Sequence, residues 1–316
     1  MRHERHFGGT IISIRDRPKV FANCVKFANW NFEPASATSS SMTEPSPQIF
    51  DRELYLARQS KTKATHDLQN MVAAELGDRL SIILKQFPKA LVIAQNPEVA
   101  AETLKLVGGV EKLDVLAPVA GDVVKLPSSD YDAIFSLLDL HCVNDVPGHL
   151  AQLARGLKAD GLLLVAFFAG DTLFELREAW LQSEIEITGG VSPRVAPMIG
   201  VRELGGLMQR AGLALPVADV DRTIVRYADA FALMGEVKSF GYSNPLQGRS
   251  LKLVSKRFIS KVAEHYHTHF ADEDGRVRAT LEIAWAMAWK PHESQPKPLK
   301  PGSASHRLAD ILKNQA

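Results

Sequence analysis

Hydrophobic positions follow two different patterns along residues 49–189, and their alternation predicts an α/β fold. Four short runs are nearly all apolar and are expected to be strands: 90–94, 112–117, 132–138 and 162–168. Apolar residues at helical spacing predict helices at 49–58, 68–87, 97–107, 148–157 and 171–185. The 68–87 helix is expected to bury Leu80 and Leu84, and a weaker strand is expected around Val123. Strands that are apolar on both faces are typical of a parallel sheet with helices on both sides.

Beyond Gly189 the pattern changes. Residues 189–197 are rich in turn formers, and helical spacing resumes at 201–211, 228–238 and 251–269. Extended segments are expected at 213–227 and 279–289, and the last of them is expected to pair antiparallel at the sheet edge. We therefore expect a single domain over 42–290 with a helical insertion around 229–270.

The two ends of the chain differ from this domain. Residues 1–41 carry six basic and three acidic side chains and end in a Ser-rich run before Met42. We expect this segment to be disordered, with Met42 as a possible true start. Residues 291–316 form a Pro- and Lys-rich arm, which is expected either to cover the sheet edge or to contact a partner protein.

Composition narrows the class of protein. With 37 basic and 36 acidic residues the net charge is +1, so no global field favours nucleic acid. No apolar run reaches the roughly 18 residues that a transmembrane helix needs. Two cysteines make a disulfide framework unlikely to be the basis of the fold, and a cytoplasmic location is expected.

Polar residues directly after the third apolar run are the first candidates for chemistry. Asp139 and His141 follow this strand, and His141 is either a general base or a locally hydrogen-bonded residue. Cys142 is expected to be a buried, inert thiol. His265 and His269 share a helix face that His267 does not, so no metal site is predicted there. Residues 272–276 are interpreted as a turn, because they lack the full calcium-loop pattern.

Three stretches together resemble a known family. They are Ile49-Phe-Asp-Arg52 with the residues that follow it, the segment 136–161, and the set formed by 170–177, 192–197 and 291–295. The combination resembles the methyltransferase-like family of the mitochondrial complex I assembly factor 5 and its proteobacterial relatives. Malonyl-carrier-protein methyltransferase of biotin synthesis is a more distant cousin.

The resemblance implies a class I methyltransferase (Rossmann-like) fold, doubly wound and mostly parallel, with an antiparallel edge strand. Such folds bind S-adenosylmethionine (SAM) at the carboxyl ends of the strands. Asp122 takes the place of a residue that contacts the adenine, and Asp114 that of a ribose-binding acid. The cofactor-binding residues implied are Ala94, Asn96, Asp114, Asp122, Val123, Leu138 and Asn144, and the catalytic ones are Asp139 and His141.

One departure from the family is large. The first strand of such enzymes runs into a glycine-rich loop, whereas this chain reads Val92-Ile-Ala-Gln-Asn-Pro97. Two functions therefore stay open. The first is a SAM-dependent methyltransferase acting on a protein or a small molecule and linked to complex I assembly, although some relatives are linked to arginine hydroxylation instead. The second is a non-enzymatic assembly or binding factor whose partner is a protein client.

Overall fold

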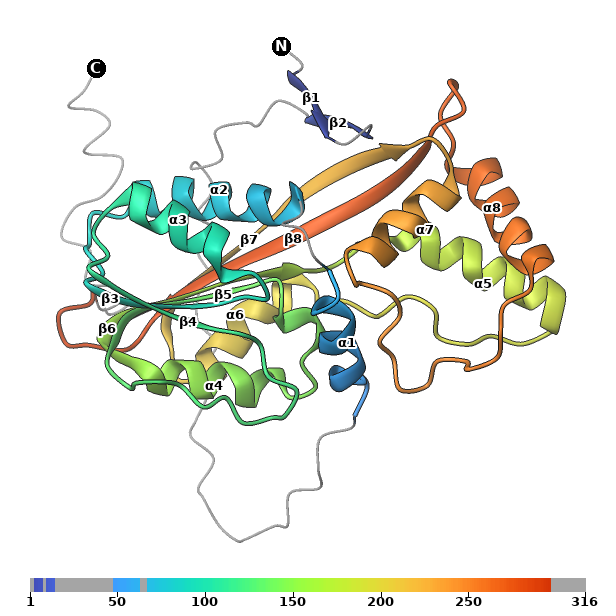
Figure 1. Ribbon diagram of the computed structural model, residues 1–316. Coiled ribbons are helices and arrows are strands. Elements are labelled where there is room, and N and C mark those ends of the chain that lie inside the picture. Colours follow the sequence, from blue (N-terminus) through green and yellow to red (C-terminus); the bar gives the residue numbers. More distant parts are fainter. Residues whose placement is uncertain (1–2, 8–9, 15–47, 63–66, 297–316) are drawn as a thin grey trace, which may run out of the picture.

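The computed structural model describes residues 3–7, 10–14, 48–62 and 67–296, and for the first two segments only the backbone (Figure 1). Its strands are β1 (His3–Phe7), β2 (Thr10–Ile14), β3 (Lys89–Ile93), β4 (Lys112–Leu116), β5 (Tyr131–Leu137), β6 (Leu157–Phe168), β7 (Ala214–Tyr227) and β8 (Val277–Trp289). Its α-helices are α1 (Arg52–Gln59), α2 (Asp67–Ser81), α3 (Pro97–Val107), α4 (Val146–Gly156), α5 (Phe174–Thr188), α6 (Val201–Arg210), α7 (Ala230–Ser239) and α8 (Lys256–Phe270). A short 3-10 helix, η1, covers Leu140–Cys142.

All these strands form one sheet in the order β1-β2-β7-β8-β6-β5-β3-β4. Strands β3, β4, β5 and β6 are parallel, whereas β8 is antiparallel to both β6 and β7. The α/β fold class predicted from the sequence is confirmed, and the antiparallel strand β8 lies between β6 and β7. Disorder was expected for residues 1–41, but the described parts of that segment are the strands β1 and β2, which extend the sheet beyond β7. The rest of that segment lies outside the described residues.

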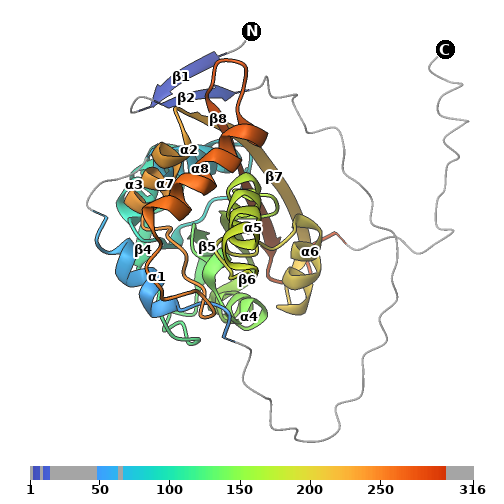
Figure 2. The same cartoon turned by 90° about the vertical axis from the view of Figure 1, so that its right-hand side faces the viewer.

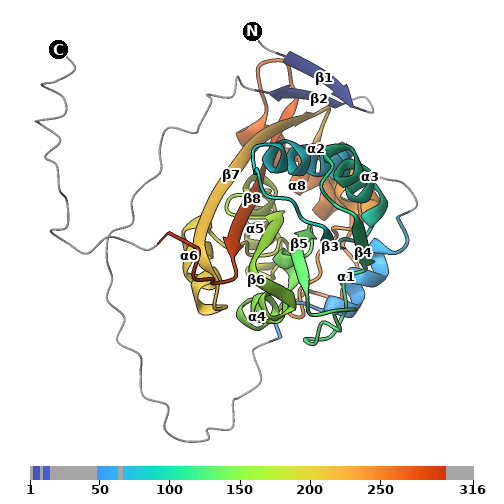
Figure 3. The same ribbon diagram turned by 90° about the vertical axis from the view of Figure 1, so that its left-hand side faces the viewer.

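The parallel strands are buried on both faces, as their sequence predicts. Along β3, Leu91 and Ile93 pack into a core layer with α4 and α6, whereas Ala90 and Val92 pack into a layer with α2 and α3. Successive side chains of a strand point to opposite faces, so an all-apolar run fills both layers. Figure 3 looks along the sheet and shows helices on its two sides.

Three helices cover the end of β7 and the start of β8, and two of them, α7 and α8, lie within 229–270, where a helical insertion is expected. Helices α5, α7 and α8 pack there around Leu233, Val262, Tyr266 and Val277, and they lie together at one end of the molecule (Figures 1 and 2). This cluster is separate from the two layers on the parallel strands. The long strands β7 and β8 therefore join the parallel part of the sheet to a second apolar core.

Three local expectations are wrong. Helix α2 ends at Ser81, so Leu84 is 96% exposed instead of buried. Val123 lies in a loop and is 67% exposed, because the weak strand expected there does not form. Strand β6 begins at Leu157, five residues early, and a left-handed residue, Asp160 with φ 61°, accommodates the turn-like sequence next to a register shift with β5.

Candidate functional site

The strand order of the parallel sheet reverses at β3, where open α/β sheets have their ligand-binding crevice at the carboxyl edge. Strand β3 pairs with both β4 and β5, and the chain crosses from β4 over β3 to reach β5. The loop 117–130 after β4 and the loop 138–145 after β5 therefore leave the sheet on either side of β3. In open α/β sheets this is where ligands bind.

Arg52, the first residue of α1, lies across this crevice. Its Nε donates to the Val119 carbonyl at 2.6 Å, on the loop after β4. Its Nη2 donates to Asp139 Oδ2 at 2.7 Å, and its Nη1 to the Cys142 carbonyl at 3.4 Å, both after β5. One guanidinium thus connects the two loops between which a cofactor would lie.

The Arg52–Asp139 ion pair is buried. The two residues are 6% and 1% exposed. Burial lowers the pKa of Arg52, but the Asp139 carboxylate raises it, and the pKa ends above its ordinary value. The second carboxylate oxygen of Asp139, Oδ1, is buried and has no hydrogen-bond partner among the described residues. The catalytic role expected for Asp139 remains a prediction, and what the structure gives this carboxylate is a charge-assisted bond to Arg52.

His141 lies two residues after Asp139, in the 3-10 helix η1, and its ring is part of a cluster of aromatic rings. Its ring centroid is 4.8 Å from that of Phe168 and 5.8 Å from that of Tyr242. The Tyr55 hydroxyl donates to the Leu138 carbonyl at 3.2 Å, so its lone pair is free to accept from His141 Nε2 at 3.3 Å. Burial lowers the pKa of His141 to about 4. The imidazole is therefore neutral near pH 7 and is a weak base.

The loop after β3 contains the first two of the implied cofactor residues. Ala94 is 7% exposed, packs in the layer under α2 and α3, and donates its N–H to the Leu116 carbonyl at 3.2 Å. Asn96 precedes α3 without capping it, because its amide donates to Gln69 Oε1 at 3.1 Å. Both residues already pack against or hydrogen-bond to neighbouring protein groups. Residues 92–97 contain no glycine, whose missing side chain would let a ligand approach the backbone.

Of the implied adenine and ribose contacts, Asp114 lies away from the carboxyl edge, whereas Asp122 lies in the loop after β4. Asp114 lies in the middle of β4, where its carboxylate accepts a hydrogen bond from the Tyr131 hydroxyl at 2.8 Å. It is therefore not at the carboxyl edge, and a ribose contact is not supported. Asp122 is exposed in the loop after β4, and its backbone carbonyl accepts from Gln152. Among the implied acids, Asp122 alone has a carboxylate with no hydrogen bond or ion pair among the described residues.

Leu138 and Asn144 hold the chain in place on the other side of the crevice. Leu138 has a left-handed backbone with φ 56°, and its N–H donates to Ala166 in β6. The Asn144 side chain accepts from the N–H groups of Ile49 and Phe50 and donates to the Phe50 carbonyl, at 2.8 to 3.0 Å. Asn144 thus fixes the segment that leads into α1 and positions Arg52.

These residues do not fit SAM. The strand exit that would lie against the methionine part has Ala94 and Asn96 in place of glycines, and Asp114 and Asn144 are already hydrogen-bonded to protein groups. Arg52 joins the two loops across the crevice.

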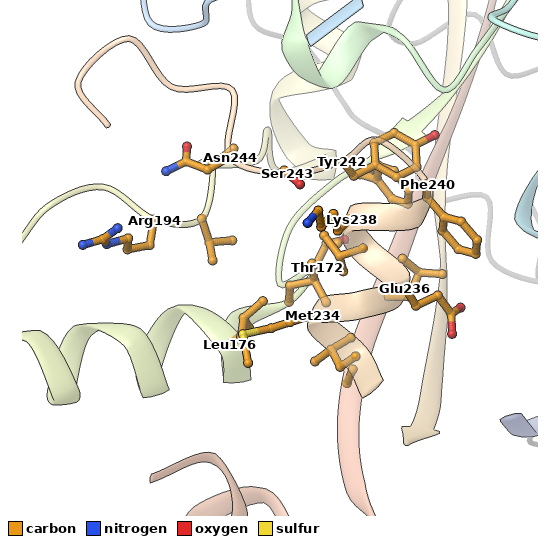
Figure 4. A pocket seen from close by; sticks show the side chains of 18 of the residues that line it. Thr172, Leu176, Arg194, Met234, Glu236, Lys238, Phe240, Tyr242, Ser243 and Asn244 are labelled. Carbon is orange, nitrogen blue, oxygen red and sulfur yellow. The ribbon is translucent and has the colours of Figure 1, made fainter. Parts of the chain in front are cut away.

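A cavity lies beside this edge of the sheet, on the side of α5 and α7. It has a volume of about 660 Å³ and extends from His141 in η1 and Phe168 at the end of β6 to α5, α7 and the start of β8. Its wall is mainly apolar, and Figure 4 shows Met234 of α7 reaching toward Leu176 of α5. This volume lies within the range of about 300–1,000 Å³ that is typical of ligand sites.

The other residues singled out from the sequence have structural partners. The Cys142 thiol is buried, and burial raises its pKa. His265 contacts Glu186 at 2.9 Å and stacks on His269, while Asp272 and Asp274 pair with Arg226. In the described part of the chain, no group of three or more metal-ligating side chains comes together. None of the helices in this part is long and apolar enough to cross a membrane.

The proline-rich arm begins against the sheet, and its end lies outside the described residues. Gln295 donates to Asp160 Oδ1 and to the Lys290 carbonyl, at 3.0 and 2.9 Å. The first residues of the arm therefore lie beside the start of β6. Its expected contact with a partner protein remains a prediction.

The fold and the crevice define the class: a class I methyltransferase fold, with a parallel sheet whose strand order reverses at β3 and an antiparallel strand after β6. No family model matches the chain. Arginine-hydroxylase NDUFAF5 of rat mitochondria is 32% identical over 304 residues, covering 88% of this chain and 88% of the relative. The human protein of the same name is 33% identical and covers 84% of each chain. The chain belongs to the NDUFAF5 family.

Two further comparisons are more remote. Malonyl-[acyl-carrier protein] O-methyltransferase of Laribacter hongkongensis is 34% identical over 188 residues, covering 58% of this chain and 61% of the relative. Among solved structures, the YcgJ protein of Bacillus subtilis is 13% identical with a TM-score of 0.43, covering 70% of this chain and 99% of its own. The expected cytoplasmic location is wrong, because the family members at 32–33% identity are mitochondrial proteins.

Sequence analysis assigned no role to Arg52, although this residue belongs to one of the stretches that resemble the family. Its partner Asp139 is 87 residues away, so no local sequence pattern connects the two. Tyr55, which holds His141, follows on the same helix one turn later. The available signal was an arginine at the start of an otherwise amphipathic helix.

Proposed function

We propose that this chain is an assembly factor for respiratory complex I that acts by binding a protein client and does not need SAM. The observation that carries this proposal is the Arg52 guanidinium, which joins both sides of the crevice and is neutralised there by Asp139. The link to complex I follows from membership of the NDUFAF5 family, and the mitochondrial names of those relatives support a mitochondrial site of action.

A second candidate is a SAM-dependent methyltransferase. The relatives named malonyl-[acyl-carrier protein] O-methyltransferase favour it, as does the cavity that opens beside His141. In that case Arg52 would have to release Asp139 before the cofactor could enter. The names of the NDUFAF5 relatives favour hydroxylation of arginine, which is a different reaction on the same fold.

Gene deletion and rescue test the proposed function. A strain without this chain is expected to contain less assembled complex I on native gels, and the wild-type chain is expected to restore it. Asp122→Ala removes an exposed carboxylate that such a fold would use for the cofactor, yet we expect it to restore assembly to the wild-type level. Unchanged complex I in the deletion strain would reject the assembly role, and a folded Asp122→Ala protein that fails to rescue would favour the SAM-dependent enzyme.

A further inference from the structure

The cavity beside the crevice has the lining of a site for a flexible apolar ligand. Three methionines from different elements contribute to its wall: Met71, Met198 and Met234. Methionine side chains are flexible and polarizable, so they adapt to a chain that can bend. The cavity also runs over several elements, from α2 to the start of α8, which suits an extended ligand better than a compact one.

Most polar groups in the wall are already bonded to other protein groups. The Thr172 hydroxyl bonds the Ala169 and Glu282 carbonyls, and the Arg194 guanidinium pairs with Glu184 at 2.8 Å. Glu236 accepts a hydrogen bond from the Tyr227 hydroxyl. Figure 4 shows the charged ends of Arg194 and Glu236 directed away from the middle of the cavity. These groups leave few directed contacts for a polar ligand.

Lys238, near the end of α7, is different. It lines the cavity and is exposed to solvent, so the cavity opens where this side chain lies. Figure 4 places it between Ser243 and Thr172. Its ammonium group has no ion pair with any described residue. An unpaired cation at the opening of an apolar cavity is complementary to a ligand with an anionic head and an apolar tail.

The loop before α8 adds an apolar and basic rim. Val254 of this loop lines the cavity, whereas Leu251 and Leu253 are 83% and 101% exposed. Three basic residues of the same stretch form no ion pair with a described residue: Lys252, Lys256 and Arg257. Exposed leucines beside unpaired cations favour contact with an amphiphile in a lipid surface or on a soluble carrier.

We propose that this cavity binds the acyl chain of an anionic amphiphile, with its carboxylate or phosphate at Lys238. The shared chemistry is a long alkyl chain with a single anionic head, whether it comes from a membrane lipid or from a soluble acyl carrier. The apolar wall takes the chain, and Lys238 with the basic loop holds the head. The cavity shares Tyr55 and His141 with the neighbourhood of Arg52, but the proposal does not rest on the proposed client.

Calorimetric titration with sodium laurate, below its micelle concentration, tests the proposal on the full chain. We expect a Kd in the range of about 1–100 μM. Met234→Trp fills the middle of the cavity and is expected to weaken binding by about a hundredfold, while Lys238→Ala weakens it by about tenfold. Dodecanol, which has the same chain without the charge, is expected to bind about tenfold more weakly than laurate.

Matched variants separate binding from folding. Leu181→Trp adds the same bulk on the exposed side of α5 and is expected to leave laurate binding unchanged. Lys238 is exposed, so Lys238→Ala keeps the fold even where Met234→Trp does not. No heat with laurate, or equal affinity in the wild type and in both folded variants, overturns the proposal.

A vesicle experiment identifies the source of the ligand. Sedimentation with phosphatidylglycerol vesicles that is lost in the double variant Leu251→Ser and Leu253→Ser identifies a membrane lipid. Laurate binding without vesicle binding identifies a soluble carrier. Either outcome counts for the acyl-chain site only together with laurate binding that Met234→Trp weakens, and vesicle binding without that laurate binding overturns the proposal.

Discussion

Replacing Arg52 with alanine is expected to lower the free energy of unfolding by about 3–5 kcal/mol. The variant leaves Asp139, which is 1% exposed, as an uncompensated buried carboxylate. It also removes the donors to the Val119 and Cys142 carbonyls, which join the loops after β4 and β5. Urea unfolding of the two proteins at pH 7 measures the difference.

A double-mutant cycle separates the ion pair from the packing around it. Asp139→Leu alone leaves the guanidinium unpaired and is expected to cost a similar amount, whereas Arg52→Met with Asp139→Leu recovers most of the loss. The recovery is expected because Asp139 Oδ1 has no partner, so the natural pair is incompletely satisfied. Lys261→Ala is the surface control and is expected to change the free energy of unfolding far less than either single variant, because its ion pair with Glu186 is exposed to solvent. Losses that are small in both single variants would show that the crevice is not closed by this pair.

Lowering the pH from 7 to 5 is expected to cost the wild type about 2 kcal/mol more of unfolding free energy than it costs a His141→Gln variant. The pKa of His141 is about 4 in the folded protein and 6.5 ordinarily, because burial disfavours the charged ring. Below pH 6.5 the unfolded chain therefore binds a proton that the folded chain does not. The stabilisation is complete at neutral pH and is lost as the pH falls from about 6.5 toward 4.

Denaturation curves at several pH values check this difference. Other groups that titrate between pH 7 and 5 are common to both proteins and cancel in the comparison. His267→Gln, at an exposed position on α8, is the control and is expected to follow the wild type. A wild-type curve that falls in parallel with the His141→Gln curve would mean that His141 is protonated as easily in the folded state as in the unfolded one.

The main architecture could be predicted from the sequence because the parallel strands are buried on both faces. Short apolar runs such as 90–94 and 162–168 have few alternatives, and β3 and β6 form there. Predictions from weaker hydrophobic patterns were wrong where the residues have no strand or helix to pack against. Val123 has one apolar neighbour and no strand to pair with, and Leu84 lies three residues beyond the end of α2.

The site was harder to predict, because its contacts join distant residues. Asp114 lies in β4 and Asn144 in the loop after η1, and their hydrogen-bond partners are Tyr131 and the segment before α1. Nothing in the local sequence indicates that a guanidinium from residue 52 pairs with residue 139. The prediction of a cytoplasmic location was wrong for another reason. A low cysteine count fits any reducing compartment and does not select the cytoplasm.

We propose that the Arg52–Asp139 ion pair closes the carboxyl edge of the sheet to SAM. Calorimetric titration of the wild-type chain with SAM, beside Asp122→Ala as a control, tests it most directly. We expect no binding heat for either protein at SAM concentrations up to about 1 mM. Binding of SAM by the wild type with a Kd of about 1–50 μM, abolished by Asp122→Ala, would contradict this proposal. It would indicate that the chain is a SAM-dependent enzyme.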